Sequence, residues 1–189
     1  MILIGSRAAA LGGCLPTWRG GQMDDWDFYG DAGDVQRMRA YLAERCGAYE
    51  EANDRLGGVH FLDGKGLRIS FLAWGAVADA LTVAPDGFAA EALGQAVTAI
   101  GPHAQLALKL GYLRCAGFHA DKNERDVSHW LDTLAPEGWT PAHDAVFRRM
   151  WTRAEEIFRT SPSDIEASAE MARLNRFLNI GEPSCRLSS

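Results

Sequence analysis

The sequence is poor in cysteine and contains no long apolar run. Its four cysteines, Cys14, Cys46, Cys115 and Cys185, lack the paired spacing of a zinc site or a redox-active dithiol. A reduced, cytoplasmic environment is therefore expected. No apolar stretch approaches the roughly 18 residues that a membrane-spanning helix needs, so a membrane partner is not expected.

Positive charge is also scarce. The 189 residues carry a formal net charge of -6, and only three of the 19 basic residues are lysines. Proteins that bind nucleic acid through a general surface neutralise many phosphates with basic side chains, so a general DNA-binding surface is not expected. A local basic pocket remains compatible with this composition. The hydrophobic content of 47% and the charged content of 23% are typical of a globular chain.

Acidic residues gather near the N-terminus. Five aspartates without an intervening base fall within eleven positions: Asp24, Asp25, Asp27, Asp31 and Asp34. Such a cluster is repulsive unless water solvates it or a cation neutralises it. Both interpretations stay open on composition alone.

Hydrophobic periodicity and turn residues predict strands first and helices afterwards. Strands are expected at residues 1–4, 25–29, 59–62 and 67–74, the last two joined by a hairpin turn at 63–66. Helices are expected at 7–11, from the N-cap Asp34 to 45, and near 88–100, 103–117, 121–134, 141–160 and 163–178. This order indicates an α+β fold with a small mixed sheet and a helical C-terminal half. We expect an α/β core at 1–87, a helical region packed on it at 88–180 and a loose tail at 181–189.

The segment Asp25-Trp26-Asp27 has the spacing of a metal-binding pair. Alternate residues of a strand point to the same face, so both carboxylates share one face and Trp26 occupies the other. Two convergent carboxylates can bind a divalent cation. The motif is short and common, and a solvated strand end explains it equally well.

The bend at Gly5-Ser6 gives the acidic pair a context. A strand that ends in Gly-Ser before a helix offers backbone N–H groups and a hydroxyl to phosphate oxygens. A phosphate site and a metal pair on neighbouring strands would suit phosphoryl or nucleotidyl transfer.

These residues resemble a known family. The segment 2–8 (Ile-Leu-Ile-Gly-Ser-Arg-Ala), then Arg19 and Asp25-Trp26-Asp27-Phe28, are similar to the opening of the DNA polymerase beta-like nucleotidyltransferase superfamily. They are most similar to its small bacterial and phage members with Gly-Ser-Arg-Ala and Asp-Trp-Asp motifs. The similarity extends more weakly to about residue 134, through Leu108-Lys109-Leu110 and through Lys122 with Asp126.

The resemblance implies roles for particular residues. In that superfamily the Gly-Ser turn contacts the triphosphate, the aspartate pair binds magnesium, and a later helical lysine positions phosphates. It therefore implies a nucleotidyltransferase-like sheet, Mg²⁺ as cofactor, and a nucleoside triphosphate such as ATP as substrate. The acceptor could be a small molecule, a protein or an RNA end. The implied metal ligands are Asp25 and Asp27, and the implied nucleotide-binding residues are Gly5, Ser6, Arg7, Arg19, Lys109 and Lys122.

One element of the family pattern is missing. The third carboxylate normally lies on a later strand, where residues 67–74 offer Arg68 and Ser70 but no acid. Asp63, in the expected hairpin, is the nearest candidate. Since the third acid commonly activates the attacking hydroxyl, a binding module without turnover is the alternative to an enzyme.

Two further residues, His60 and Trp18, are expected near the proposed site, and one other function uses the same acidic motif. His60 is expected on a strand near the proposed site, and Trp18 lies in a loop that could place its ring against a base. A sugar-nucleotide glycosyltransferase would also use an Asp-x-Asp metal motif. It is disfavoured because such folds place a nucleotide-binding region of roughly a hundred residues before that motif.

Overall fold

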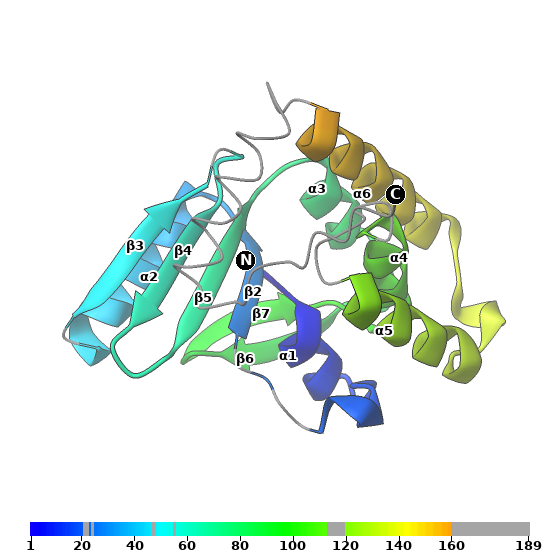
Figure 1. The fold of residues 1–189 in the computed structure, drawn as a ribbon, viewed down its shortest axis with the longest axis horizontal. Helices are drawn as coiled ribbons and strands as arrows, with labels where there is room; N and C mark the ends of the chain where they lie inside the picture. Colours follow the sequence, from blue (N-terminus) through cyan, green and yellow to red (C-terminus); the bar gives the residue numbers. More distant parts are fainter. Residues whose placement is uncertain (21–22, 24, 47, 55, 113–119, 160–189) are drawn as a thin grey trace, which may run out of the picture.

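The protein, described here from a computed structural model, is built on one mixed sheet (Figure 1). The structure describes residues 1–20, 23, 25–46, 48–54, 56–112 and 120–159. Seven strands lie in the order β3-β4-β5-β2-β1-β7-β6. The sheet is followed by helices alone in the described chain, which confirms the expected α+β fold with a helical C-terminal part.

Three short strands form the middle of the sheet. β1 (Ile2–Ile4) pairs antiparallel with β2 (Asp25–Gly30), and β2 pairs in parallel with β5 (Arg68–Ala73). All three residues of β1 are buried, as expected for a central apolar strand. The strands predicted at 1–4, 25–29 and 67–74 are therefore confirmed.

Hairpins form both edges of the sheet. β3 (Tyr49–Asn53) and β4 (Val59–Asp63) extend it beyond β5, and β3 was not anticipated from the sequence. At the other edge β6 (Phe88–Ala92) pairs with β7 (Gln95–Ala99), and β7 pairs in parallel with β1.

The helix expected at residues 88–100 is therefore wrong. Alanine-rich composition suggested a helix, but burial in β7 alternates, with Val97 and Ala99 buried and Thr98 exposed. Leu93 and Gly94 have positive φ angles of 52° and 69°, which turn the chain back on itself between the two strands. Tertiary pairing with β1 overrides the local helix propensity.

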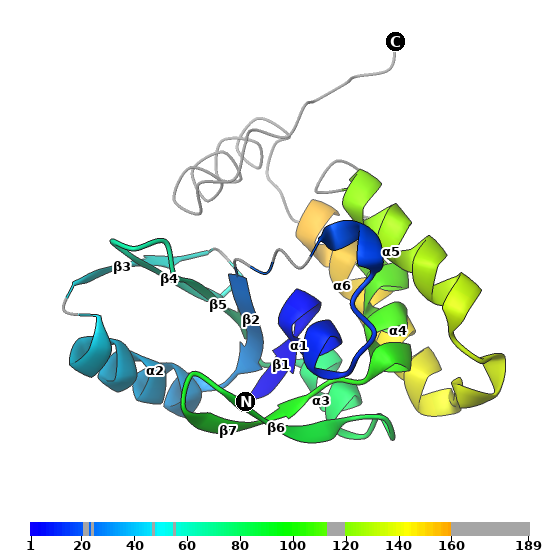
Figure 2. The same cartoon turned by 90° about the horizontal axis from the view of Figure 1, so that it is seen from below.

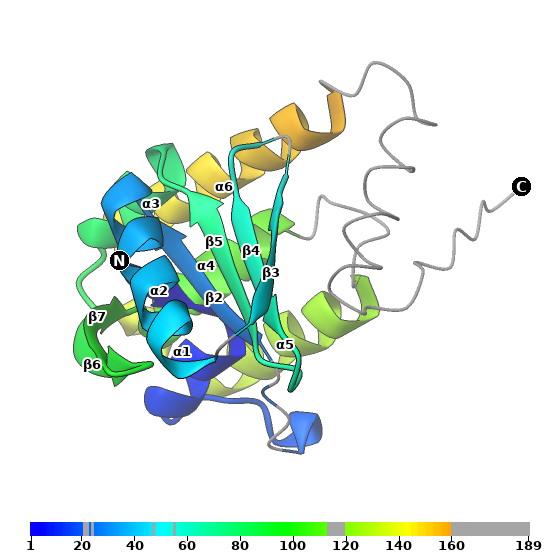
Figure 3. The same ribbon diagram turned by 90° about the vertical axis from the view of Figure 1, so that its left-hand side faces the viewer.

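The helices lie in two places relative to the sheet. α2 (Ala32–Arg45) lies alongside β2 and its neighbours, as Figures 2 and 3 show. The short α1 (Gly5–Leu11) lies between β2 and α4 (Pro102–Tyr112), and α4 packs against α5 and α6 (Figure 2). The remaining elements are α3 (Ala76–Thr82), α5 (Ala120–Thr133), α6 (Pro141–Arg159), and the short 3-10 turns η1 (Thr17–Arg19) and η2 (Pro136–Gly138).

The helices expected at 121–134 and 141–160 are confirmed within one residue. The expected helix at 163–178, the tail at 181–189 and residues 113–117 of another expected helix lie outside the described residues. No helix in the described ranges is both long enough and apolar enough to cross a membrane.

The acidic segment after β2 caps a helix, one turn earlier than expected. Asp31, not Asp34, is the N-cap of α2, and its side chain accepts a hydrogen bond from the Asp34 backbone N–H at 2.8 Å. The Asp34 side chain accepts from the Asp31 N–H at 3.0 Å, which completes a capping box. Two of the five clustered acids therefore stabilise a helix start and do not belong to a metal site.

Aromatic side chains pack the centre of the hydrophobic core. The Phe28 ring stacks on Phe71 with centroids 5.2 Å apart, and Phe71 contacts Phe61 edge to face at 6.2 Å. All three are at most 1% exposed. They join β2, β5 and β4 on the sheet face opposite to Asp25 and Asp27, so this packing fixes the strands that carry the acidic pair.

We expect Phe71→Ala to lower the free energy of unfolding by about 3–5 kcal/mol, because it leaves a cavity between two buried rings. Urea denaturation followed by circular dichroism measures the loss. Val83→Ala is the control, since Val83 is 66% exposed and its truncation should change stability little. Equal effects of the two substitutions would contradict this packing.

Candidate nucleotide and metal site

The Gly5 bend lies directly against Asp27. β1 and β2 pair so that Ile4 is opposite Asp27, and Gly5 follows with a φ of +70°. A Cβ atom on Gly5 would stand only 2.8 Å from the Asp27 Oδ2 atom. Glycine is therefore required at this position both by its backbone angle and by the approach of the carboxylate. Gly5 and Asp27, twenty-two residues apart in the sequence, therefore lie side by side, as predicted from the sequence.

Asp25 and Asp27 point to the same face of β2, beside two residues of β5. The parallel register places Asp25 opposite Arg68 and Asp27 opposite Ser70. The Arg68 Nη1 atom lies 3.7 Å from the Asp25 Oδ1 atom. Burial, followed by the charge of Asp25, raises the pKa of Asp27 to about 6. A carboxyl with a raised pKa next to a second carboxylate has the electrostatics of a site that a cation would stabilise.

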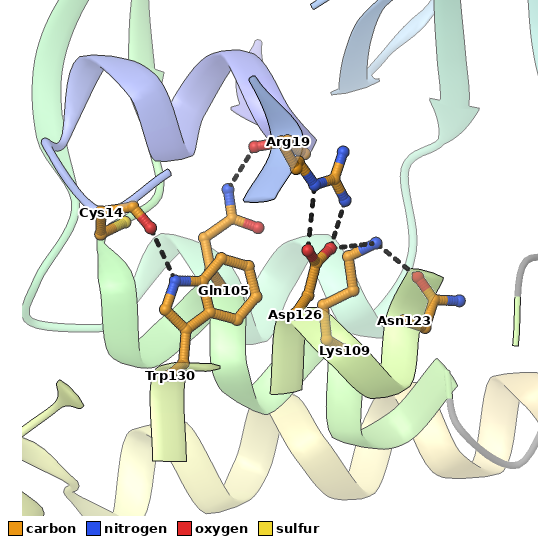
Figure 4. A network of polar contacts seen from close by, with 8 residues as sticks. Cys14, Arg19, Gln105, Lys109, Asn123, Asp126 and Trp130 are labelled. Carbon is orange, nitrogen blue, oxygen red and sulfur yellow. Dashed lines mark hydrogen bonds and ion pairs between the residues drawn. The ribbon is translucent and has the colours of Figure 1, made fainter. Parts of the chain in front are cut away.

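A cationic cluster from three other segments lies near this pair. Arg19 of η1 binds Asp126 of α5 through both carboxylate oxygens, with Nε to Oδ1 at 2.9 Å (Figure 4). Lys109 of α4 donates to the Asn123 Oδ1 atom at 2.6 Å and lies 3.6 Å from the Asp126 Oδ2 atom. Asp126 is fully buried, so this single carboxylate fixes both cations in place.

The charges of the cluster act on the acidic pair. Lys109 and Lys122 both lower the pKa of Asp27, against the larger effect of its burial. Burial lowers the pKa of Lys109 to about 8 despite the opposing charge of Asp126. Desolvation, and then the charge of Arg19, lower the pKa of Lys122. These cations repel one another, and a bound anion would reduce the repulsion.

Gln105 ties α4 to the Gly5 bend. Its side-chain Nε2 donates to the Gly5 carbonyl oxygen at 2.7 Å, and the residue is fully buried (Figure 4). Lys109 follows one turn later on α4, so the same helix that contacts the bend also presents a cation to the acidic pair. Gln105 was not predicted from the sequence, because nothing in the local pattern separates it from an ordinary helix residue.

Arginine side chains stack on the two tryptophans near the site. The Arg7 guanidinium lies 4.5 Å from the ring centre of Trp26, while Arg19 and Arg125 lie 5.2 Å and 4.1 Å from the ring centre of Trp18. Trp18, which was expected to be able to stack on a base, thus already contacts two guanidinium groups. Within the described chain, the buried Nε atoms of Arg7 and Arg68 have no hydrogen-bond partner. Unsatisfied cationic donors of this kind suit an anionic ligand.

Asp63 does not supply the missing third carboxylate. Its Oδ1 atom accepts from the backbone N–H groups of Lys65 and Leu67, at 2.9 Å and 2.7 Å, and so forms the β4–β5 turn. Alternation along β4 also places Asp63 on the face opposite to His60. This candidate from the sequence is wrong, because hairpin geometry uses the carboxylate for backbone hydrogen bonds. No group of three acidic, histidine or cysteine side chains suited to a metal occurs in the described ranges.

Ser70 occupies the strand position beside Asp27, and His60 lies on its other side. β4 pairs with β5 so that His60 is opposite Ser70. The His60 ring bonds both the Ser70 hydroxyl and the Asp54 carboxylate. His60 was predicted to lie near the site from its strand position, whereas Asp54 lies in a turn that no local pattern distinguishes.

Comparison with known proteins finds similarity among solved structures only. No protein-family model matches the chain, and no curated protein matches it. The chain is similar to a crystal structure described as an antigenic nucleotidyltransferase-like protein from Paracoccidioides brasiliensis, at 13% identity over 93% of this chain and 78% of that one. The TM-score is 0.41.

We expect Gly5→Ala to lower the free energy of unfolding by about 1–3 kcal/mol, because alanine disfavours the positive φ and its Cβ would meet Asp27. Gly64→Ala is the matched control, since a Cβ there meets nothing within 4 Å. Urea titrations of both variants measure the difference. Equal stability of the two variants would contradict the close approach of Gly5 to Asp27.

We expect Asp27→Asn to stabilise the metal-free protein at pH 7.5. The pKa of Asp27 is raised from 3.8 to about 6. Protonation of this carboxyl therefore contributes fully to the stability of the folded state below about pH 4, and the contribution is lost as the pH rises through 6. Asparagine removes the cost of ionisation, which is at most about 3 kcal/mol at one pKa unit per 1.36 kcal/mol.

Thermal unfolding at pH 7.5 and pH 4.5 measures this effect. The stabilisation should be present at pH 7.5 and should shrink towards zero at pH 4.5. Asp132→Asn, at an exposed acid of α5, should leave stability unchanged at both values. A destabilised Asp27→Asn variant at pH 7.5 would contradict the electrostatic description of the site.

Proposed function

We propose that the protein is a magnesium-dependent nucleotidyltransferase that binds a nucleoside triphosphate and transfers its nucleotidyl group to an acceptor hydroxyl. The observation that carries this proposal is the meeting of the Gly5 bend with Asp27, beside the Arg19 and Lys109 cluster. A pair of carboxylates and several cations lie side by side at this site. A metal-bound polyphosphate supplies both the cation and the anions that such a site lacks.

The acidic pair fits a divalent cation. Asp25 and Asp27 are oxygen ligands on one face of β2, and Mg²⁺ is usually bound by one or two carboxylates together with substrate phosphates. Asp25 and Asp27 would hold the cation, which would neutralise the negative charge that develops in the transition state. The raised pKa of Asp27 means that this carboxylate ionises most readily when a cation is present.

The cationic side chains would orient the phosphates. Asn123 and Asp126 orient Lys109, and Asp126 also orients Arg19, so both cations are in position before a ligand binds. Arg7 and Lys122 would add charge from α1 and α5, while the Gly5 and Ser6 backbone would allow close approach of the phosphate chain. Groups fixed before binding lose little entropy when the substrate arrives.

A binding module without turnover is the second candidate function. Ser70 occupies the place beside Asp27 at which the sequence resemblance implies a third carboxylate. A protein without a base at that place would still bind the metal and the triphosphate. Release of pyrophosphate from the triphosphate distinguishes an enzyme from a binding module. The acceptors to be tested are water, sugars, nucleosides, peptides and RNA ends.

The proposed site is tested by nucleotide binding. Isothermal titration of the protein with nonhydrolysable analogues of the four ribonucleoside triphosphates, with and without Mg²⁺, should show metal-dependent binding. Asp25→Asn combined with Asp27→Asn should weaken it by about 100-fold or more, since even the outer partners of metal ligands contribute 10- to 100-fold.

The control for this experiment is a double variant with the same charge change elsewhere. Glu44→Gln combined with Asp132→Asn removes two exposed acids on α2 and α5 and should leave binding unchanged. Magnesium-dependent binding that survives in the Asp25 and Asp27 double variant would overturn the proposed site.

A further inference from the structure

Polar residues of three strands form a row across the sheet beside the proposed metal site. The register places Asp27 of β2 opposite Ser70 of β5, and Ser70 opposite His60 of β4. Paired residues of neighbouring strands point to the same face about 5 Å apart. The three side chains therefore lie in sequence on one face, with Ser70 between the metal pair and the histidine.

A continuous chain of hydrogen bonds runs outward from Ser70. The His60 Nδ1 atom lies 3.2 Å from the Ser70 Oγ atom, and its Nε2 atom lies 3.1 Å from the Asp54 Oδ2 atom. Asp54 is held in turn by the backbone N–H groups of Leu56 and Gly58, each 2.8 Å from its Oδ1 atom. His60 and Ser70 are both buried, at 4% and 7% exposure.

The hydrogen bonds define the direction of proton transfer. Burial alone would raise the pKa of Asp54, but the bonds from His60, Gly58 and Leu56 together lower it, so Asp54 is an ionised acceptor. His60 must then donate its Nε2–H to Asp54, which leaves Nδ1 as an acceptor. Ser70 donates its hydroxyl proton to Nδ1. This is the order of groups that activates a hydroxyl in unrelated enzymes.

We propose that Ser70, His60 and Asp54 form a proton relay that takes the place of the missing third carboxylate and accepts the proton of the attacking hydroxyl. Ser70 is the catalytic residue, because its hydroxyl lies beside Asp27 where the reacting groups would meet. His60 receives the proton, and Asp54 is a positioning residue that fixes the ring.

The acceptor hydroxyl passes its proton to the Ser70 Oγ atom while the Ser70 proton moves to the His60 Nδ1 atom, giving an imidazolium beside Asp54. The acceptor oxygen forms a bond to the α-phosphorus as the bond to the bridging oxygen breaks and pyrophosphate leaves. The proton on His60 returns to solvent or to the product before the next cycle.

Electrostatics around His60 are compatible with this role. Among the described residues, the charged groups around the row include Asp54 on one side and the Asp25 and Asp27 pair on the other. Arg68 lies next to Asp25, and the charges of Lys109 and Lys122 act on Asp27. A positive charge on His60 would lower the pKa of Asp27, so proton uptake by the ring favours the ionised carboxylate beside it. The relay and the acidic pair thus support each other electrostatically.

This inference rests on the proposed nucleotidyl transfer, so its test must separate binding from turnover. Turnover is measured as hydrolysis of the four ribonucleoside triphosphates to monophosphate and pyrophosphate, with water as the acceptor. It is also measured as transfer to the hydroxyl acceptors named above. The variants are Ser70→Ala, His60→Gln and Asp54→Asn. His129→Gln and Ser128→Ala on α5 are the matched controls.

We expect each relay variant to lower kcat by about 10²- to 10⁴-fold, the usual contribution of general base catalysis, with the nucleotide Kd unchanged. Ser70→Thr, which keeps the hydroxyl, should recover most of the rate. His60→Ala should recover activity when imidazoles are added, with rates that rise with the basicity of the imidazole. Circular dichroism checks that every variant is folded.

Several results would overturn the relay. These are unchanged kcat in Ser70→Ala, a rate in His60→Ala that is independent of imidazole basicity, or transfer of labelled nucleotide onto Ser70 itself. Wild-type protein that binds the magnesium nucleotide but releases no pyrophosphate with any acceptor would also overturn it and would favour the binding module. Loss of metal-dependent binding in the wild type would instead overturn the proposed function.

Discussion

The antiparallel pairing of β1 with β2 is the contact on which the site depends. It places Ile4 opposite Asp27, so that the next residue, Gly5, turns away over the carboxylate with no side chain in between. Glycine adopts the positive φ of this bend without strain, but the contact costs free energy because it leaves a carboxyl with a raised pKa. The aromatic core on the opposite face of β2 and β5 compensates by fixing these strands against each other. A region that is unfavourable by itself is thus maintained by packing behind it, as is common where proteins bind ligands.

The second organising contact joins distant parts of the chain. Arg19 and Asp126 are 107 residues apart, yet they form a two-point ion pair that also orients Lys109. A buried ion pair is weak evidence for stability, since desolvation offsets much of the attraction. Its consequence here is geometric: one buried carboxylate determines where two cations stand relative to the acidic pair. The helical C-terminal part therefore contributes to the site and does not merely cover the sheet.

Local signals in the sequence predicted the strands at 1–4, 25–29 and 67–74 and the long C-terminal helices, because each is bounded by glycine or proline and has a clear hydrophobic period. They failed at 88–100, where alanines suit a helix but pairing with β1 selects a hairpin. The approach of Gly5 to Asp27 was expected from family resemblance and the general geometry of a strand followed by a bend. The Asp54, His60 and Ser70 chain was not, because it depends on the register between β4 and β5 and on a turn at 54–58. Strand register and the partners of buried polar groups are tertiary properties, which a short sequence pattern does not encode.

The placement of β1 in the interior of the sheet has a consequence for biosynthesis. Although β1 precedes the other strands of this sheet along the chain, one of its two neighbours, β7, ends only at Ala99. Until that residue has been made, one edge of an apolar strand has no partner and is open to pairing with other chains. Completion of the sheet must therefore wait until Ala99 has been made, and slow translation of residues 30–99 would prolong the interval in which a nascent chain can aggregate.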